Sequence, residues 1–179
     1  MLRIISGHFK SRLLKTPRYG KTHPMSDRAR MALFNILGDL SGVESVLDAY
    51  GGSGALALEA VSRGAKRAVI TEINRRAYPD LVANVELLGL KGRVRTYRAN
   101  NLTCLNNLGL SFDLIFLDPP YDDIRAENLL KLADYLTPAG RLVLSYPPHF
   151  APPFEAPQWE VEHHKAYAQL RLSVYVRAR

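Results

Sequence analysis

Residues 46–59, Val-Leu-Asp-Ala-Tyr-Gly-Gly-Ser-Gly-Ala-Leu-Ala-Leu-Glu, decide the fold of this chain, because they read as a buried strand, a glycine-rich turn and the start of a helix. Gly52 and Gly54 let the backbone pass close to a ligand, and the small Ala57 lets the helix approach the strand. This arrangement is typical of a nucleotide-binding turn. It predicts a site either for a dinucleotide or for S-adenosylmethionine.

Two carboxylates are associated with this turn. Glu72 lies twenty residues beyond Gly52, at the end of the next expected strand, where a carboxylate can bind both hydroxyls of a ribose. Asp48 comes immediately before the turn, where its charge would repel a pyrophosphate but would attract an ammonium and a sulfonium. Asp48 therefore favours S-adenosylmethionine, and a nicotinamide-dependent oxidoreductase stays open as the alternative.

Strands and helices alternate outward from this turn, which predicts parallel βαβ units. The apolar run 114–117 is expected to form a central strand that is covered on both faces. Residues 137–140, Thr-Pro-Ala-Gly, are expected to form a turn before the last parallel strand. The parallel strands are expected at residues 45–48, 67–72, 93–98, 112–117 and 141–145. The helices between them are expected at residues 55–63, 75–88, 102–108 and 126–135.

The two ends of the chain complete the expected fold. Residues 159–164 and 169–177 alternate apolar and polar side chains, which predicts a closing antiparallel hairpin after a proline-rich loop at 147–157. Residues 1–24 are expected to form a β-hairpin or an extended arm, and Ser26 is expected to cap a helix. The predicted fold class is α/β: a Rossmann-like, seven-stranded, mostly parallel sheet with a C-terminal antiparallel hairpin and a small basic N-terminal hairpin-and-helix extension.

A second motif, Asp-Pro-Pro-Tyr at residues 118–121, follows the strand 112–117 at the edge where open α/β sheets bind ligands. The two prolines stiffen the turn, so the Asp118 carboxylate and the Pro119 carbonyl can be held as two acceptors for an exocyclic amine. Tyr121 offers a flat face for base stacking, worth ~1–3 kcal/mol. Orienting the amine towards an electrophilic methyl group would supply much of the rate acceleration.

The charge of the chain is uneven. It holds 24 lysines and arginines against 17 aspartates and glutamates, a net charge of +7. Residues 1–37 carry eight basic residues and one acid, so they contain the whole excess of positive charge. This predicts a polyanionic partner at that end. We therefore expect a basic, partner-contacting extension at residues 1–42 and a catalytic domain at residues 43–179.

Composition excludes several classes of protein. Hydrophobic residues make up 47% and charged residues 23%, as in an ordinary globular domain. The single cysteine, Cys104, excludes an internal disulfide framework and a multi-cysteine zinc site, and it favours the reducing cytoplasm. No apolar run approaches the ~18 residues of a membrane span. We expect no metal and no membrane partner.

The sequence resembles the class I S-adenosylmethionine-dependent methyltransferases, and more closely the RsmD-type methyltransferases that modify guanine N2 in bacterial 16S ribosomal RNA. The resemblance covers nearly the whole chain. Its matching pieces are the runs 3–7 (Arg-Ile-Ile-Ser-Gly), 27–30 (Asp-Arg-x-Arg), 33–37 (Leu-Phe-Asn-Ile-Leu), 52–56 (Gly-Ser-Gly-Ala-Leu), 59–65 (Glu-Ala-x-Ser-Arg-Gly-Ala), 118–121 (Asp-Pro-Pro-Tyr) and 171–173 (Arg-Leu-Ser).

The resemblance implies a role for each site residue. S-adenosylmethionine would be held by Asp48, Gly51, Gly52, Gly54, Glu72, Asn100 and Asn101, with the two asparagines at the adenine. Either asparagine could instead cap the helix that follows. The guanine would be received by Asp118, Pro119 and Tyr121. RNA would be held by Arg3, Lys10, Arg12, Lys15, Arg28 and Arg30. No residue is expected to bind a metal.

The implied activity is methylation of a guanine N2 in 16S ribosomal RNA, of the guanine-966 type, within a small-subunit particle and by a monomeric, cytoplasmic enzyme. S-adenosylhomocysteine would be the second product. The alternatives are methylation of adenine N6 in DNA and a non-catalytic RNA-binding assembly factor.

Three departures from the family pattern leave an altered RNA site open. His23 starts a His-Pro-Met run where relatives have Arg-Pro-Thr, and Met31 stands at a place that is usually acidic. The run 145–148, Ser-Tyr-Pro-Pro, ends the fifth strand where a glutamate is expected.

Overall fold

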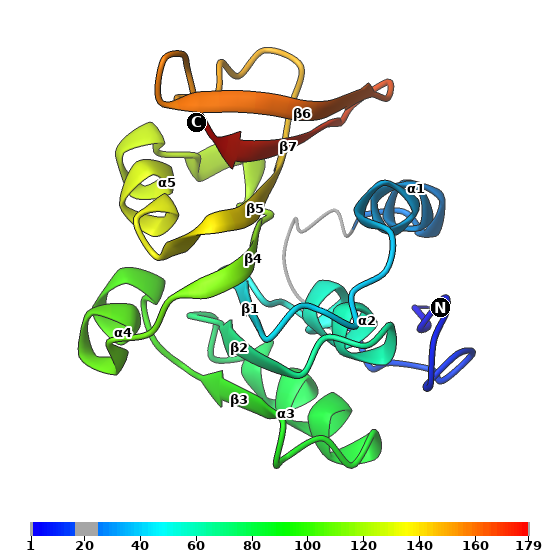
Figure 1. Ribbon diagram of the computed structural model, residues 1–179. Helices are drawn as coiled ribbons and strands as arrows, with labels where there is room; N and C mark the ends of the chain where they lie inside the picture. Colours follow the sequence, from blue (N-terminus) through cyan, green and yellow to red (C-terminus); the bar gives the residue numbers. More distant parts are fainter. Residues whose placement is uncertain (1, 17–24, 179) are drawn as a thin grey trace.

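The computed structural model describes residues 2–16 and 25–178, arranged around one seven-stranded sheet (Figure 1). The strand order is β3-β2-β1-β4-β5-β7-β6. The strands are β1 (Ser45–Asp48), β2 (Arg67–Thr71), β3 (Val94–Tyr97), β4 (Phe112–Leu117), β5 (Leu136–Tyr146), β6 (Trp159–Ala166) and β7 (Arg171–Arg177). The first five are parallel, and β7 runs antiparallel to both of its neighbours, β5 and β6. The predicted fold class is confirmed.

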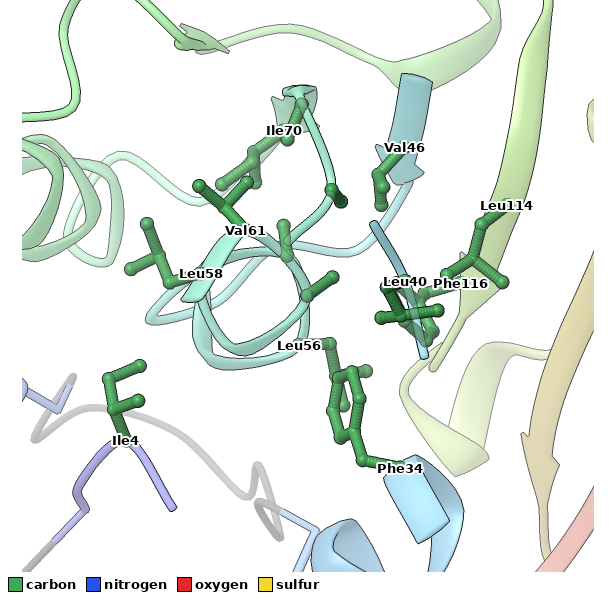
Figure 2. Packing of buried hydrophobic residues seen from close by; sticks show 14 of the residues in the cluster. Ile4, Phe34, Leu40, Val46, Leu56, Leu58, Val61, Ile70, Leu114 and Phe116 are labelled. Carbon is green, nitrogen blue, oxygen red and sulfur yellow. The ribbon is translucent and has the colours of Figure 1, made fainter. Parts of the chain in front are cut away.

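The helices cover both faces of this sheet. They are α1 (Asp27–Leu37), α2 (Ala55–Ser62), α3 (Tyr78–Leu87), α4 (Asn101–Leu108) and α5 (Ala126–Ala133), with a short 3-10 turn, η1 (Tyr121–Asp123). Successive side chains of a strand point to opposite faces, so Val46 belongs to one core and Leu47 to the other. The core on the side of α1 and α2 contains Phe34 and Phe116, whose ring centroids lie 5.8 Å apart (Figure 2).

The N-terminal segment forms a minimal hairpin that packs on α2. Arg3 bridges Leu13, and the side chain of Ile4 is 1% exposed and belongs to the same core as Leu58 (Figure 2). Gly7 has φ +83°, and a Cβ there would lie 1.9 Å from the carbonyl oxygen of Ser62, so this close approach requires glycine.

Glu59 fastens this hairpin to the domain. Its carboxylate is fully buried and accepts hydrogen bonds from the backbone N–H groups of Ile5 (2.6 Å) and Ser6 (3.0 Å) and from Nε of Arg63 (2.7 Å). Ser26 caps α1 as predicted, since its Oγ accepts a hydrogen bond from the N–H of Ala29. The basic extension is therefore packed against the sheet domain through a shared core.

One expected turn was wrong. Residues 137–140 do not precede the last parallel strand but lie inside β5. Leu136 already pairs with Phe112, and the register then shifts so that Arg141 pairs with Leu114. The strand therefore begins at the apolar Leu136, and the residues between Leu136 and Arg141 form a bulge. Helix α3 begins later than predicted, because Oδ1 of Asn74 accepts hydrogen bonds from two N–H groups of the preceding turn.

Among the helices of the described residues, none is long and apolar enough to cross a membrane.

Candidate active site

A cavity of about 640 Å³ opens at the carboxyl ends of β1, β2, β3 and β4. This volume lies within the range of small-molecule sites. The predicted site residues that line it are Asp48, Gly51, Gly52, Glu72, Asn100, Asn101, Asp118, Pro119 and Tyr121. The fold thus brings the glycine turn and the Asp-Pro-Pro-Tyr motif to one cavity, although some sixty residues separate them in sequence.

Gly54 is the predicted cofactor residue that does not line the cavity. It caps α2 with φ +79°, and its N–H donates a hydrogen bond of 2.6 Å to the carbonyl of Gly51. A Cβ at this position would lie 2.6 Å from Cδ1 of Leu81. Gly54 therefore shapes the turn and the packing of α2, and its expected contact with a cofactor is indirect.

Glu72 is bound to the glycine turn. One carboxylate oxygen accepts a hydrogen bond of 2.7 Å from the N–H of Gly52, and the other accepts one of 2.6 Å from the N–H of Asn74. Each carboxylate oxygen has a further lone pair. The carboxylate is thus fixed at the cavity wall and can still accept hydrogen bonds from two hydroxyl groups.

Asp48 is 1% exposed, and within the described residues its Oδ1 has no hydrogen-bond partner. Burial, followed by the negative charge of Asp118, raises the pKa of its carboxyl group to about 7. A buried carboxylate oxygen without a partner is costly unless a ligand satisfies it. This orphaned oxygen fits the ammonium group of S-adenosylmethionine, as the sequence predicted for Asp48.

The two asparagines serve the backbone as well as the cavity. Asn100 caps α4, and its Oδ1 accepts a hydrogen bond of 3.4 Å from the N–H of Thr103, so the helix-cap alternative is confirmed for this residue. Asn101 donates from Nδ2 to the carbonyl of Ala49 at 3.2 Å and accepts from the N–H of Leu102 at 2.8 Å. Contact with an adenine stays a prediction for both.

Asp118 has a partner that sequence reasoning missed, Ser145 at the end of β5. The Oγ of Ser145 donates to Oδ1 of Asp118 and lies 3.3 Å from the hydroxyl oxygen of Tyr121. Burial raises the pKa of Asp118, and the bond from Ser145 opposes this shift. The available signal was the position of Ser145 at the carboxyl end of the parallel strand expected at residues 141–145.

The predicted RNA-binding residues separate into three groups. Arg3, Lys10 and Arg28 are exposed and line a groove of about 430 Å³ between the N-terminal hairpin and α1, which we call the basic groove. Arg12 and Lys15 are exposed but do not line this groove.

Arg30 does not lie on the outer surface with the other basic residues. It is 2% exposed and lines the main cavity, and it donates to the carbonyl of Arg3 (2.6 Å) and to Oδ1 of Asp27 (3.0 Å). Its Nε has no partner within the described residues, and burial lowers the pKa of its guanidinium. Of the departures from the family pattern, Met31 is 46% exposed and lines the basic groove, and His23 lies outside the described residues.

Comparisons with known proteins agree with this geometry. Residues 2–176 match the model of a family described as Conserved hypothetical protein 95. The chain is 30% identical to the Ribosomal RNA small subunit methyltransferase D of Escherichia coli, over 98% of this chain and 90% of the relative. It is 31% identical to the protein of the same name from Haemophilus influenzae, over 73% of this chain and 69% of the relative.

A solved structure, titled "Putative methyltransferase yhhF from Escherichia coli", superimposes with a TM-score of 0.86 at 29% identity. The match covers 99% of this chain and 98% of that one. The match therefore extends over the N-terminal extension as well as the sheet domain.

Proposed function

The chain belongs to the Conserved hypothetical protein 95 family, that of the RsmD-type ribosomal RNA methyltransferases, and from this premise we propose that it methylates the exocyclic N2 of a guanine in 16S ribosomal RNA. The guanine-966 type of activity is the specific form that we propose. The observation that carries this proposal is the meeting of Asp48 and Asp118 at one cavity, where the charge of one raises the pKa of the other.

S-adenosylmethionine is the proposed methyl donor, and when bound it supplies a methyl group on a positively charged sulfur. The orphaned Oδ1 of Asp48 would accept hydrogen bonds from its ammonium group. Glu72 would hold its ribose, and Asn100 and Asn101 would meet its adenine at the ends of β3 and α4. The turn at Gly51 would let the ligand lie against the backbone. No metal takes part in this proposal.

The amine is oriented by the other half of the cavity. Oδ2 of Asp118, which has no hydrogen bond within the described residues, and the carbonyl of Pro119 would accept hydrogen bonds from the two N–H groups of the guanine amine. This would aim the nitrogen lone pair at the methyl group. Tyr121 would stack on the base. As the new C–N bond forms, the bond between the methyl carbon and sulfur would break and S-adenosylhomocysteine would leave. The nitrogen must also lose a proton, and the raised pKa of Asp118 suits its Oδ2 to accept that proton.

The ribosomal RNA is the proposed partner, as part of a small-subunit particle, with the enzyme acting as a monomer in the cytoplasm. We assign residues 1–42 to RNA contact and residues 43–179 to methyl transfer. The basic groove supports this division, since Arg3, Lys10 and Arg28 come together there within reach of one phosphodiester backbone. Arg12 and Lys15 would extend the contact, and Arg30 would act at the cavity wall.

The decisive experiment is methylation of small-subunit particles from a strain that lacks the gene. Incubation with donor carrying a labelled methyl group should place the label on N2-methylguanine, mapped by mass spectrometry of the nucleosides. Labelled N6-methyladenine in duplex DNA would instead favour the DNA alternative. Absence of any cofactor binding would favour a non-catalytic assembly factor, and saturable binding of NAD alone would favour an oxidoreductase.

A further inference from the structure

Ser145 connects two residues of the proposed amine site without lining the cavity itself. It follows Leu144, which pairs with Leu117 in the register of β4 and β5, so that Ser145 lies beside Asp118 at the edge of the sheet. Its side chain is 1% exposed. The Oγ donates to Oδ1 of Asp118 and contacts the hydroxyl of Tyr121 at 3.3 Å.

The direction of these hydrogen bonds follows from the number of donors. An ionised carboxylate only accepts, and a serine hydroxyl has one proton to donate. Since Ser145 gives its proton to Asp118, the hydroxyl of Tyr121 must donate to Ser145. Burial raises the pKa of Tyr121 to about 12, so this phenol keeps its proton at every working pH. A directed chain therefore runs from Tyr121 through Ser145 to Oδ1 of Asp118.

The two prolines of the motif cannot fix the side chain of Asp118, as the hydrogen bonds from Tyr121 through Ser145 can. They fix the backbone of the turn, but the Asp118 side chain still has two torsions of its own. Within the described residues no hydrogen bond holds the other oxygen, Oδ2, so the bond from Ser145 determines where Oδ2 points.

We propose that Ser145 is a positioning residue, which locks the rotamer of Asp118 so that Oδ2 and the Pro119 carbonyl together hold the target amine. This inference rests on the proposed function and adds to it a residue outside the Asp-Pro-Pro-Tyr motif.

The pKa of Asp118 distinguishes a positioning role of Ser145 from a role in packing alone. Burial raises the pKa of Asp118, whereas the hydrogen bond from Ser145 lowers it, so loss of Ser145 must raise it further. Other ionisable groups line the same cavity: Asp48 from β1, Glu72 after β2, Tyr121, Asp122 and Asp123 from η1, and Arg30 from α1. These groups are unchanged in the variant described next, which loses only the two hydrogen bonds of Ser145, to Asp118 and to Tyr121.

Ser173 on β7 provides a matched control. It is also 1% exposed, pairs with Leu144 across the sheet and lies 3.0 Å from a tyrosine hydroxyl, that of Tyr146. Its other hydrogen-bond partners are Nδ1 of His164 and the hydroxyl of Tyr175, and neither is a carboxylate. Ser145→Ala and Ser173→Ala therefore each remove one buried hydroxyl from neighbouring strands, and only the first removes a bond to Asp118.

The test titrates the full-length protein by carboxyl ¹³C NMR, without RNA, and then measures methylation against pH. In Ser145→Ala the pKa of Asp118 should rise, because the hydrogen bond that lowers it is lost, while Ser173→Ala should leave it unchanged. The acid limb of kcat should move up by the same amount, with kcat about tenfold lower and the KM for the methyl donor unchanged.

An unchanged pKa of Asp118 in Ser145→Ala would overturn the inference, and so would equal losses of kcat in the two variants. The titration needs no substrate. If the wild-type protein methylates no guanine, the proposed function fails, while the NMR result still decides whether Ser145 controls Asp118.

Discussion

Strands β1 and β4 lie side by side in the sheet, and each leads to an aspartate that lines the same cavity. The surroundings of the two carboxylates differ. Oδ1 of Asp48 has no partner within the described residues, whereas Oδ1 of Asp118 accepts a hydrogen bond from Ser145. The unpaired oxygen is suited to a cation that a ligand brings, and the paired one is oriented before any ligand arrives. The same residue type thus serves two tasks because its neighbours differ.

The largest effect should come from Asp118→Asn. The amide keeps the shape of the side chain but loses the charge that holds the amine and accepts its proton, so kcat should fall about 100- to 10,000-fold. At pH 8, where Asp48 is ionised with or without the charge of Asp118, cofactor affinity should stay within about twofold, because Asp48 and the glycine turn are intact. Initial rates of methyl transfer and calorimetric titration of the cofactor measure the two quantities.

The matched control for this variant is Asp134→Asn, at the end of α5, whose side chain is 77% exposed. Its rate should equal that of the wild type. If Asp118→Asn kept wild-type turnover, Asp118 would not act in catalysis, and its difference from Asp48 would not matter for the reaction.

The next effect concerns cofactor affinity and its dependence on pH. Loss of a charged hydrogen bond in Asp48→Asn should weaken binding of S-adenosylmethionine about 10- to 100-fold at pH 8. In the wild type the pKa of Asp48 is raised to about 7, so its carboxyl is protonated below that pH and cannot pair with an ammonium. The wild-type Kd should therefore rise about tenfold per pH unit below 7.

Calorimetry at pH 5.5, 6.5 and 8 gives the comparison. The affinity of Asp48→Asn should hardly change over this range, and Asp134→Asn should follow the wild type. A wild-type Kd that is flat between these pH values would mean that Asp48 does not bind the cation.

Without a ligand, Asp48 should lower the stability of the folded protein. Its pKa is raised on folding, so between about pH 4 and about pH 7 the folded state binds more protons than the unfolded state, and the free energy of unfolding falls as pH rises. Asp48→Asn removes this loss and should be more stable than the wild type at pH 8, by an amount that shrinks at pH 5. Urea unfolding of the cofactor-free proteins at pH 5 and pH 8 measures this difference. If the free energies of unfolding of the wild type and of Asp48→Asn changed equally with pH, the prediction would be contradicted. Asp118, whose pKa is also raised, should keep part of the slope in the variant.

The sequence predicts the parts of this comparison that are local. Apolar runs and glycines specify β1, β4 and their turns, so the meeting of Asp48 and Asp118 at one edge follows from the βαβ order. The contact between Ser145 and Asp118 depends on which residue of β5 faces β4, and the bulge at 137–140 sets that register from a distance. The sequence pattern can therefore place Ser145 at the carboxyl end of its strand, but not against Asp118.

Helix α1 shows the same limit. Arg28 and Arg30 are two positions apart in a basic segment, and sequence alone assigns both to RNA. Two residues correspond to about 200° around a helix, so only one of them can face outward. Arg28 is exposed at the basic groove, and Arg30 is buried at the cavity wall, where it bonds to Asp27 and to the carbonyl of Arg3.

The smallest effect should distinguish the basic groove from the rest of the basic extension. Arg28→Ala and Lys10→Ala should each weaken RNA binding a few-fold and reduce the slope of log affinity against log salt by about 0.7, the value for one phosphate contact on a single strand. Arg12→Ala is the comparison, since Arg12 is exposed on the hairpin that carries Lys10 but does not line the groove, so its loss should change the slope less than the loss of Arg28. Filter binding of a 16S fragment between 50 and 300 mM salt gives the slopes. If the RNA backbone follows the basic groove, the loss of Arg28 must reduce the slope more than the loss of Arg12. Equal slopes for Arg12→Ala and Arg28→Ala would mean instead that RNA contacts the whole hairpin surface.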